Sequence, residues 1–175
     1  FLSPFFLLNA ANNILTSTIG DEIKLSNNDS SKVISISLNP VSAVISGGRL
    51  ADYAFWFNNH DGGWITGNYY TDSLPKWVKD FNAKGFQDVY IRKSWASMHS
   101  LSDNYKKSLP DDNPFEIGFS NYRYTFPYDL PYLRNRSGNY KYIKFTPFGN
   151  TYTKDFAIST IVAEDLGKDE YTDFL

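Results

Sequence analysis

The chain has 175 residues, a formal net charge of −2 and a pI of about 5.6, a balance that gives no reason to expect a nucleic-acid or membrane-surface partner. It contains no cysteine, which excludes disulfides and thiolate metal sites. The apolar run Phe5–Leu8 is far shorter than the roughly 20 residues that cross a bilayer, so no membrane span is expected. Aromatic residues make up 18% of the chain and indicate either a heavily aromatic core or a surface that stacks sugars or bases.

The two ends of the chain suggest a piece of a longer protein. It begins at Phe1 without a methionine, and residues 1–13 are expected to form a connector or a short helix. Residues 171–175 begin a pattern typical of a sheet strand. The length suffices for one core with a subdomain.

The first regular element is a predicted helix with Thr18 as its N-cap. Asp21 follows three residues later and completes an imperfect capping box. Ile19, Ile23 and Leu15 are expected on its buried face. The polar residues 27–31 end the helix, and a strand follows directly.

That strand, residues 33–38, is the centre of the predicted fold. Its β-branched apolar residues are typical of a strand buried on both faces of a mostly parallel sheet. Pro40 ends it, and we expect a loop with a glycine turn at 47–48, a common location for a ligand pocket in open α/β sheets. The apolar run 54–57 and the extended residues 64–66 predict two further strands on either side of a glycine turn.

The second half of the chain is predicted to be less regular. A short helix over 76–84 should end at Gly85, and residues 86–95 are compatible with another. Residues 119–128 and 140–145 alternate enough to predict strands of a small irregular subdomain.

A clear helix is predicted over 151–166, closed by Gly167. Its buried face should comprise Tyr152, Phe156, Ile158, Ile161, Val162 and Leu166. The fold class is therefore α/β, with residues 1–70 and 146–175 as a layered core portion and residues 71–145 as an irregular α+β insertion.

No catalytic constellation is evident in the residues themselves. His60 and His99 are too far apart in sequence to form a zinc site without several carboxylates, and structural roles are favoured for both. The pair Asp111–Asp112 is either an acid pair or, more simply, a solvated turn. Phosphate-binding glycine loops and nucleophile-elbow patterns are missing from the sequence.

Between residues 121 and 145, basic residues alternate with tyrosines. Such interleaving occurs in single-strand nucleic-acid platforms and also in a strand with one packed tyrosine face. The second interpretation is favoured because the chain has no net positive charge. The residues concerned are Arg123, Arg134, Arg136, Lys141 and Lys144, with Tyr122, Tyr124, Tyr132, Tyr140 and Tyr142.

Four segments, in order, resemble one known family. They read SKVISISL, GGRLADYAFWF, GGWITGNYYTDSLPKWVKDFNAKG and FTPFGNTYTKDF with YTDFL. They are similar to secreted alkaline phosphatases of the type I phosphodiesterase/nucleotide pyrophosphatase family, within the alkaline phosphatase superfamily. The resemblance implies a large α/β sheet between helices, with a cap-like insertion beside a metal site, and it is weakest over 98–142.

The resemblance also implies that the chemistry lies outside these 175 residues. In this family a threonine nucleophile precedes the region similar to Phe1, and the aspartate and histidine zinc ligands begin just after the region similar to Leu175. The parent protein would use two zinc ions and act in the periplasm or as a secreted enzyme. This chain would hold neither a catalytic residue nor a metal ligand, and by itself it would be inactive.

One departure from the family bears on the substrate. Monoester-specific members carry Lys-Asp-Arg after the central strand, where this chain has Asn39-Pro40-Val41. Lysine and arginine there would bind the charged oxygens of a phosphate monoester. We expect Asn39 and Val41 to line the substrate side and to favour a diester or another phosphoric ester, unless Arg49 substitutes for the lost cation. A rival hypothesis from another class is a non-catalytic, aromatic-rich module that binds carbohydrate.

Overall fold

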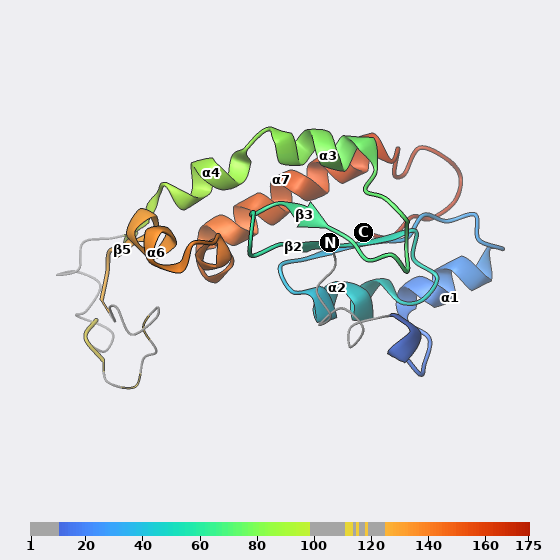
Figure 1. Ribbon diagram of the computed structural model, residues 1–175. Helices are drawn as coiled ribbons and strands as arrows, with labels where there is room; N and C mark the ends of the chain where they lie inside the picture. The colour runs from blue at the N-terminus through green and yellow to red at the C-terminus, as the bar shows by residue number, and fades with distance from the viewer. Residues whose placement is uncertain (1–10, 99–110, 114, 116–117, 119–124) are drawn as a thin grey trace.

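The computed structural model of the chain describes residues 11–98, 111–113, 115, 118 and 125–175. It is a mixed α/β structure, as predicted (Figure 1). The elements in chain order are the 3₁₀ helix η2 (Ala11–Asn13), α1 (Ile19–Ser26), β1 (Ile34–Ser37), α2 (Pro40–Gly47), β2 (Tyr53–Phe57), β3 (Trp64–Ile65), α3 (Lys76–Ala83), α4 (Phe86–Ile91), β4 (Ser94–Trp95), β5 (Tyr128–Asp129), α6 (Leu130–Ser137), the 3₁₀ helix η4 (Lys141–Phe145) and α7 (Pro147–Ala163).

The central sheet has the strand order β1-β2-β3. Strands β1 and β2 are parallel, with Ile34 opposite Tyr53, and β3 runs antiparallel to β2. On the other side of β1, Phe174 forms a parallel bridge with Val33, so the strand predicted at the C-terminal end begins to pair there. Helices α1 and α2 lie on one face of this sheet, and α3 and α7 lie on the other (Figure 1).

The segment after β1 is a helix, and the loop predicted there is wrong. Asn39 is the N-cap of α2: its Oδ1 accepts hydrogen bonds from the backbone N–H of Val41 at 2.9 Å and of Ser42 at 3.4 Å. Pro40 occupies the first helical turn, where its missing N–H costs nothing. The proline that ends the strand therefore also starts the crossover helix to β2.

Helix α1 has the predicted capping box but not the predicted buried face. Ile19 is 69% exposed and Leu15 still more so, whereas Asp21 and Lys24 are buried. The reason is electrostatic: Lys24 Nζ lies 2.8 Å from Asp52 Oδ1, and Asp21 accepts the backbone N–H of Leu50 at 2.7 Å. These partners belong to other elements, so the spacing within the helix did not reveal them.

The middle of the chain departs most from expectation. Helix α3 is confirmed, with Gly85 at φ 71° after it, but α4 is shorter than predicted because Trp95 belongs to β4. The strand predicted over 140–145 is wrong, since these residues form η4. Helix α6 was not predicted; Asp129 caps it by accepting the N–H of Tyr132 at 3.0 Å. Of the predicted strand 119–128, residues 119–124 lie outside the described part.

Helix α7 begins and ends earlier than predicted. Its C-cap is Glu164, so the helix ends before the predicted Gly167. Tyr152 and Phe156 are buried as expected. Ile158, Ile161 and Val162 are exposed instead, because the inward face of the helix runs through Gly149, Tyr152, Phe156 and Thr160.

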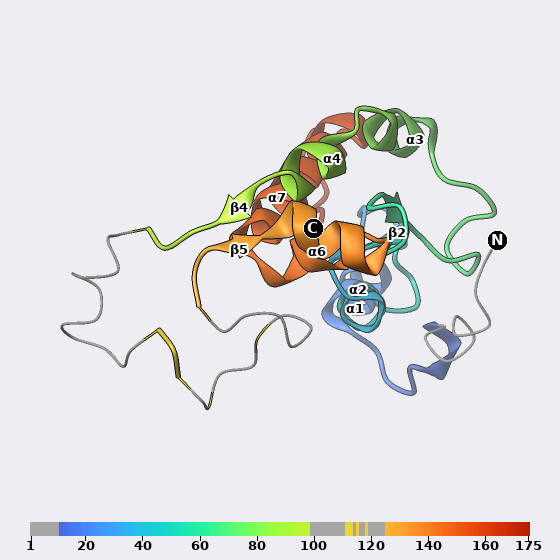
Figure 2. The ribbon, with the colours of Figure 1, turned by 60° about the vertical axis from the view of Figure 1, so that its left-hand side comes forward.

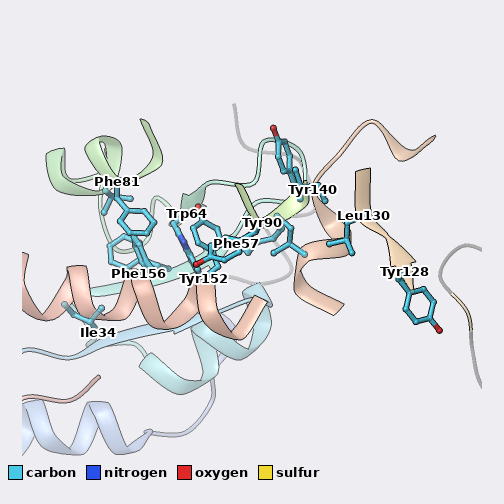
Figure 3. Packing of buried hydrophobic residues seen from close by; sticks show 14 residues of the cluster. Ile34, Phe57, Trp64, Phe81, Tyr90, Tyr128, Leu130, Tyr140, Tyr152 and Phe156 are labelled. Atoms are coloured by element: carbon cyan, nitrogen blue, oxygen red, sulfur yellow. The ribbon is translucent and has the colours of Figure 1, made fainter. Parts of the chain in front are cut away.

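An aromatic cluster joins the sheet to the helices above it (Figure 3). Trp64 stacks on Phe156 with ring centroids 4.5 Å apart, and Phe55 meets the same ring edge-on at 5.4 Å. Tyr152 donates its hydroxyl hydrogen to the carbonyl of Gly62 at 3.1 Å. The high aromatic content is therefore used in the core. The buried residues of this cluster, aromatic and aliphatic together, are Ile34, Phe55, Phe57, Trp64, Val78, Phe81, Tyr90, Ile91, Tyr128, Leu130, Tyr140, Ile143, Tyr152 and Phe156.

Candidate functional site

The candidate site is the carboxyl end of β1, where the chain enters α2. Ser37 Oγ accepts the backbone N–H of Asn39 at 3.1 Å, and the Asn39 side chain in turn caps the helix. The carboxamide oxygen is thus engaged, and its NH₂ group is the part that can donate to a ligand. Val41 lies in the first turn of α2 with its apolar side chain 44% exposed. The structure therefore brings Asn39 and Val41 together on an accessible edge.

Arg49 is not near this edge. It follows Gly48, which ends α2, and a helix of eight residues is about 12 Å long. The carbonyl of Arg49 accepts the hydroxyl of Tyr69 at 3.0 Å, and its side chain lines a different pocket, of about 270 Å³, with Leu15 and Tyr69. Arg49 and Val41 therefore occupy opposite ends of the same helix.

The turn between β2 and β3 forms a second border of the candidate site. The carbonyl of Asn59 accepts the backbone N–H of Tyr140 at 2.8 Å. Gly62 has φ 75°, and a Cβ at this position would lie 2.8 Å from the ring of Tyr140, so glycine is required by both backbone and space. Residues of the predicted insertion are in this way attached to the carboxyl end of β2.

The start of α7 forms the third border. Gly149 packs so closely that a Cβ there would lie 3.0 Å from Leu38 Cδ1 and 2.9 Å from the carbonyl of Ile143. Leu38 is the residue between β1 and the cap of α2, so η4 and the first turn of α7 lie directly against the candidate site.

Helix η4 carries two lysines, Lys141 and Lys144. Burial lowers the pKa of Lys144, and the nearby charge of Lys141 lowers it further. The ammonium of Lys144 lies 5.2 Å from the ring centroid of Phe145, and that of Lys141 lies 5.0 Å from that of Tyr142. The sequence did not single out these lysines as part of a site, because they were assigned to an alternating strand.

The alternating strand with a packed tyrosine face is wrong for the described residues, because the basic residues and tyrosines there lie on or beside the helices α6 and η4. The guanidinium of Arg134 lies 4.0 Å from the ring centroid of Tyr140 and donates to its hydroxyl at 2.7 Å. Burial raises the pKa of the Tyr140 hydroxyl, as does its bond to Asp88 at 2.6 Å, whereas Arg134 opposes the shift. Arg136 lies 5.9 Å from the ring centroid of Tyr132. These described cations stack on the chain's own rings; Arg123, Tyr122 and Tyr124 lie outside the described residues.

Comparisons of sequence and of structure both find proteins similar to this chain. No family model matches. The chain is 35% identical over 164 residues to alkaline phosphatase PhoV of Synechococcus elongatus and 36% identical over 166 residues to alkaline phosphatase PafA of Elizabethkingia meningoseptica. It superimposes on the crystal structure of wild-type PafA with a TM-score of 0.84 and 33% identity. Nearly the whole of this chain is therefore similar to one part of these alkaline phosphatases.

The match covers nearly all of this chain but only part of each relative. It spans 93% of this chain and about 30% of PhoV and PafA, and 94% of this chain and 31% of the PafA structure. A PafA variant with four substitutions gives the same TM-score at 34% identity. A Myroides odoratus protein named calcium-transporting ATPase is 42% identical over 166 residues, again over 30% of its length. The resemblance inferred from the sequence segments is confirmed.

The described residues of this chain hold no ligand set that fits a metal centre. No three histidine, aspartate or glutamate side chains gather in the part of the chain that the structure describes. His60 is exposed on the β2–β3 turn, where its backbone N–H donates to Asn58 Oδ1 at 3.1 Å, and His99 is not among the described residues. Asp111 and Asp112 lie in a bend, as the turn interpretation expects, and Asp111 also accepts the backbone N–H of Phe126 at 2.9 Å.

Proposed function

We propose that this chain is the part of a zinc-dependent phosphoric ester hydrolase that supplies core scaffold and the cap beside the active site. The similarity to the alkaline phosphatases PhoV and PafA carries the proposal. Residues 1–70 and 146–175 are its core portion, and residues 71–145 are the cap. The attachment of Tyr140 to the β2–β3 turn supports a cap that borders the carboxyl ends of the strands.

The nucleophile and the metal ligands belong, in this proposal, to polypeptide outside this chain. Zinc would activate the attacking hydroxyl and stabilise the leaving oxygen. The parts contributed here are the position of the Asn39 amide, the apolar surface of Val41 and the closure of the site by η4 and α7. The chain alone is therefore expected to bind no zinc and to hydrolyse no phosphoric ester.

A direct comparison tests this division. The full-length protein and residues 1–175 are each assayed for zinc by atomic emission spectroscopy and for hydrolysis of bis(4-nitrophenyl) phosphate. We expect two zinc ions and activity in the full-length protein only. Stoichiometric zinc and turnover in the short chain contradict the proposal.

We further propose that the substrate is a small-molecule phosphoric diester. A monoester presents more anionic oxygens than a diester and gains more from bidentate guanidinium contacts. Val41 offers no donor, and the Asn39 carboxamide already caps α2 through its oxygen. Arg49, at the far end of α2, is poorly placed to replace the missing cation.

The test compares 4-nitrophenyl phosphate with bis(4-nitrophenyl) phosphate on the full-length protein. We expect higher kcat/KM for the diester, and an increase in monoesterase activity of about tenfold in the double variant Asn39→Lys/Val41→Arg, the order of one charge-assisted bond. Ile45→Arg is the matched control, because Ile45 is also apolar and exposed on α2 but lies one turn further on. A strong preference of the unmodified protein for the monoester contradicts the diester proposal.

The superfamily relation also supports action in the periplasm or as a secreted enzyme. Within the described residues, no helix has both the length and the apolar character to cross a membrane. Fractionation of cells that produce the full-length protein tests the location, and recovery with cytoplasmic markers contradicts it. The carbohydrate-module hypothesis loses its main support, since the described aromatic residues largely form the core.

A further inference from the structure

Helices α3 and α7 enclose an apolar groove of about 330 Å³. Trp77 and Phe81 supply its α3 side, and Ile158, Val162 and Ala163 supply its α7 side. Figures 1 and 2 show the two helices side by side, on the face of the sheet opposite α1 and α2. A hydrophobic groove of this kind has the shape and chemistry that receive the apolar face of another helix.

Side-chain hydrogen bonds hold the two walls of the groove in place. The indole N–H of Trp77, in the first turn of α3, donates to Glu164 Oε1 at 2.5 Å, just after the end of α7. The hydroxyl of Tyr90, on α4, donates to Asp155 Oδ2 in the middle of α7, also at 2.5 Å. The segment from α3 to α4 and helix α7 therefore run antiparallel and are fixed to each other at two points.

The outward face of α7 is aliphatic beside this groove. Ile158 is 53% exposed and Val162 is 69% exposed, and Ile161 is exposed as well. The buried residues Tyr152 and Phe156 lie on the opposite side of the helix. Single exposed aliphatic residues are ordinary, but three of them between positions 158 and 162 form a patch of the kind that marks a contact surface.

The rim of the groove is positively charged at Lys84. This residue lines the groove, and its ammonium lies 5.9 Å from the ring centroid of Phe81. The carboxylate of Asp80, also at the rim, is paired with Lys76 at 2.5 Å. A segment with an apolar face and a carboxylate at its edge is therefore the complementary occupant.

The length of the relatives indicates where such a segment comes from. This chain spans 29% of PhoV and 30% of PafA, so in the proposed function most of the polypeptide lies outside residues 1–175. A second copy of the protein would need to bury about 1,200 Å² or more to form a stable interface. A segment of the same molecule is held at high effective concentration and needs a much smaller contact.

We propose that an amphipathic helix from the polypeptide outside residues 1–175 lies in the groove between α3 and α7. Its apolar face covers Ile158, Ile161 and Val162, and a carboxylate on it lies near Lys84. The inference rests on the proposed function, since it takes this chain to be part of a longer protein.

Photo-cross-linking of the full-length protein identifies the occupant. Ile158 is replaced by photo-leucine, a diazirine amino acid of similar size, and the cross-linked peptides are identified by mass spectrometry. We expect a cross-link within one molecule to a peptide from outside residues 1–175. The same replacement of Val89, which is 55% exposed on α4 and outside the groove, is the matched control and should not give this cross-link. A covalent dimer, or cross-links confined to residues 1–175, overturns the proposal.

Thiol labelling measures the coverage independently. Val162→Cys in the native full-length protein should react with a maleimide at least about tenfold more slowly than in urea, because labelling of a covered side chain requires a local opening. Val89→Cys replaces the same residue type at an exposed position of α4 and should be much less protected. Equal protection at the two positions overturns the proposal.

The outcomes distinguish this contact from the hydrolase. A cross-link to the remaining polypeptide in a full-length protein that hydrolyses no phosphoric ester supports the contact and overturns the hydrolase. Hydrolysis by a protein in which residue 162 is labelled as fast as residue 89 supports the hydrolase and overturns the contact.

Discussion

Gly48 is the position where one added methyl group should cost most. It ends α2 with φ 85° and ψ −165°, a backbone conformation that side chains strongly disfavour. A Cβ there would lie 2.6 Å from both carboxylate oxygens of Asp21 and still closer to Thr18 Oγ1. Asp21 is buried and accepts the backbone N–H groups of Leu50 at 2.7 Å and Thr18 at 2.9 Å. Gly48→Ala therefore strains the backbone and displaces a buried carboxylate.

The expected loss can be worked out from these contacts. Backbone strain costs about 1–3 kcal/mol, and each weakened bond to a buried charged group costs about 1.5–3 kcal/mol. With both bonds weakened the sum is roughly 4–9 kcal/mol, a large part of an ordinary domain stability of about 5–15 kcal/mol. Urea unfolding of the full-length protein and its variant, followed by far-UV circular dichroism, measures it.

Gly138 supplies the matched control. Its φ is 68°, and a Cβ there meets nothing within 4 Å, so Gly138→Ala should cost only the backbone strain, about 1–2 kcal/mol. The difference between the two variants reports the close approach to Asp21 and Thr18, together with the more strained backbone angles of Gly48. If Gly48→Ala loses no more free energy of unfolding than Gly138→Ala, the contact of Gly48 with Thr18 and Asp21 is not as close as the structure requires.

Three further predictions use other parts of the molecule. Asn39→Ala should cost about 1 kcal/mol through loss of the α2 cap, whereas Asn39→Asp should keep that stability and raise KM for an anionic ester; equal KM values in thermal-melt-matched samples contradict the role in binding. Phe156→Ala should cost about 3–5 kcal/mol in urea unfolding, against less than 1 kcal/mol for the half-exposed Phe145→Ala, and similar losses would refute the core assignment. Burial and the bond to Asp155 raise the pKa of Tyr90 to about 12, above its unfolded value near 10, so its contribution to the free energy of unfolding is lost as pH rises from about 10 to 12. Tyr90→Phe should flatten that alkaline decline, and an unchanged slope contradicts it.

Local sequence was sufficient for several features. The β-branched run 33–38 favours a strand, and Thr18 with Asp21 favours a helix start through contacts within four residues. Gly85 marks the end of α3 because its backbone angle is open to glycine alone at low cost. The ordered segments that resemble alkaline phosphatases were likewise enough to indicate the superfamily.

Tertiary structure decided which faces are buried and which residues meet. The inward face of α1 depends on Asp52, and that of α7 on an aromatic cluster drawn from strands far away in sequence, so helical spacing alone placed Ile19 and Ile158 wrongly. The groove between α3 and α7 likewise requires chain segments that are adjacent only in space. Capping and turn hydrogen bonds form between residues close in sequence, so local sequence predicts them. Burial depends on how the whole chain packs, so local sequence does not determine it.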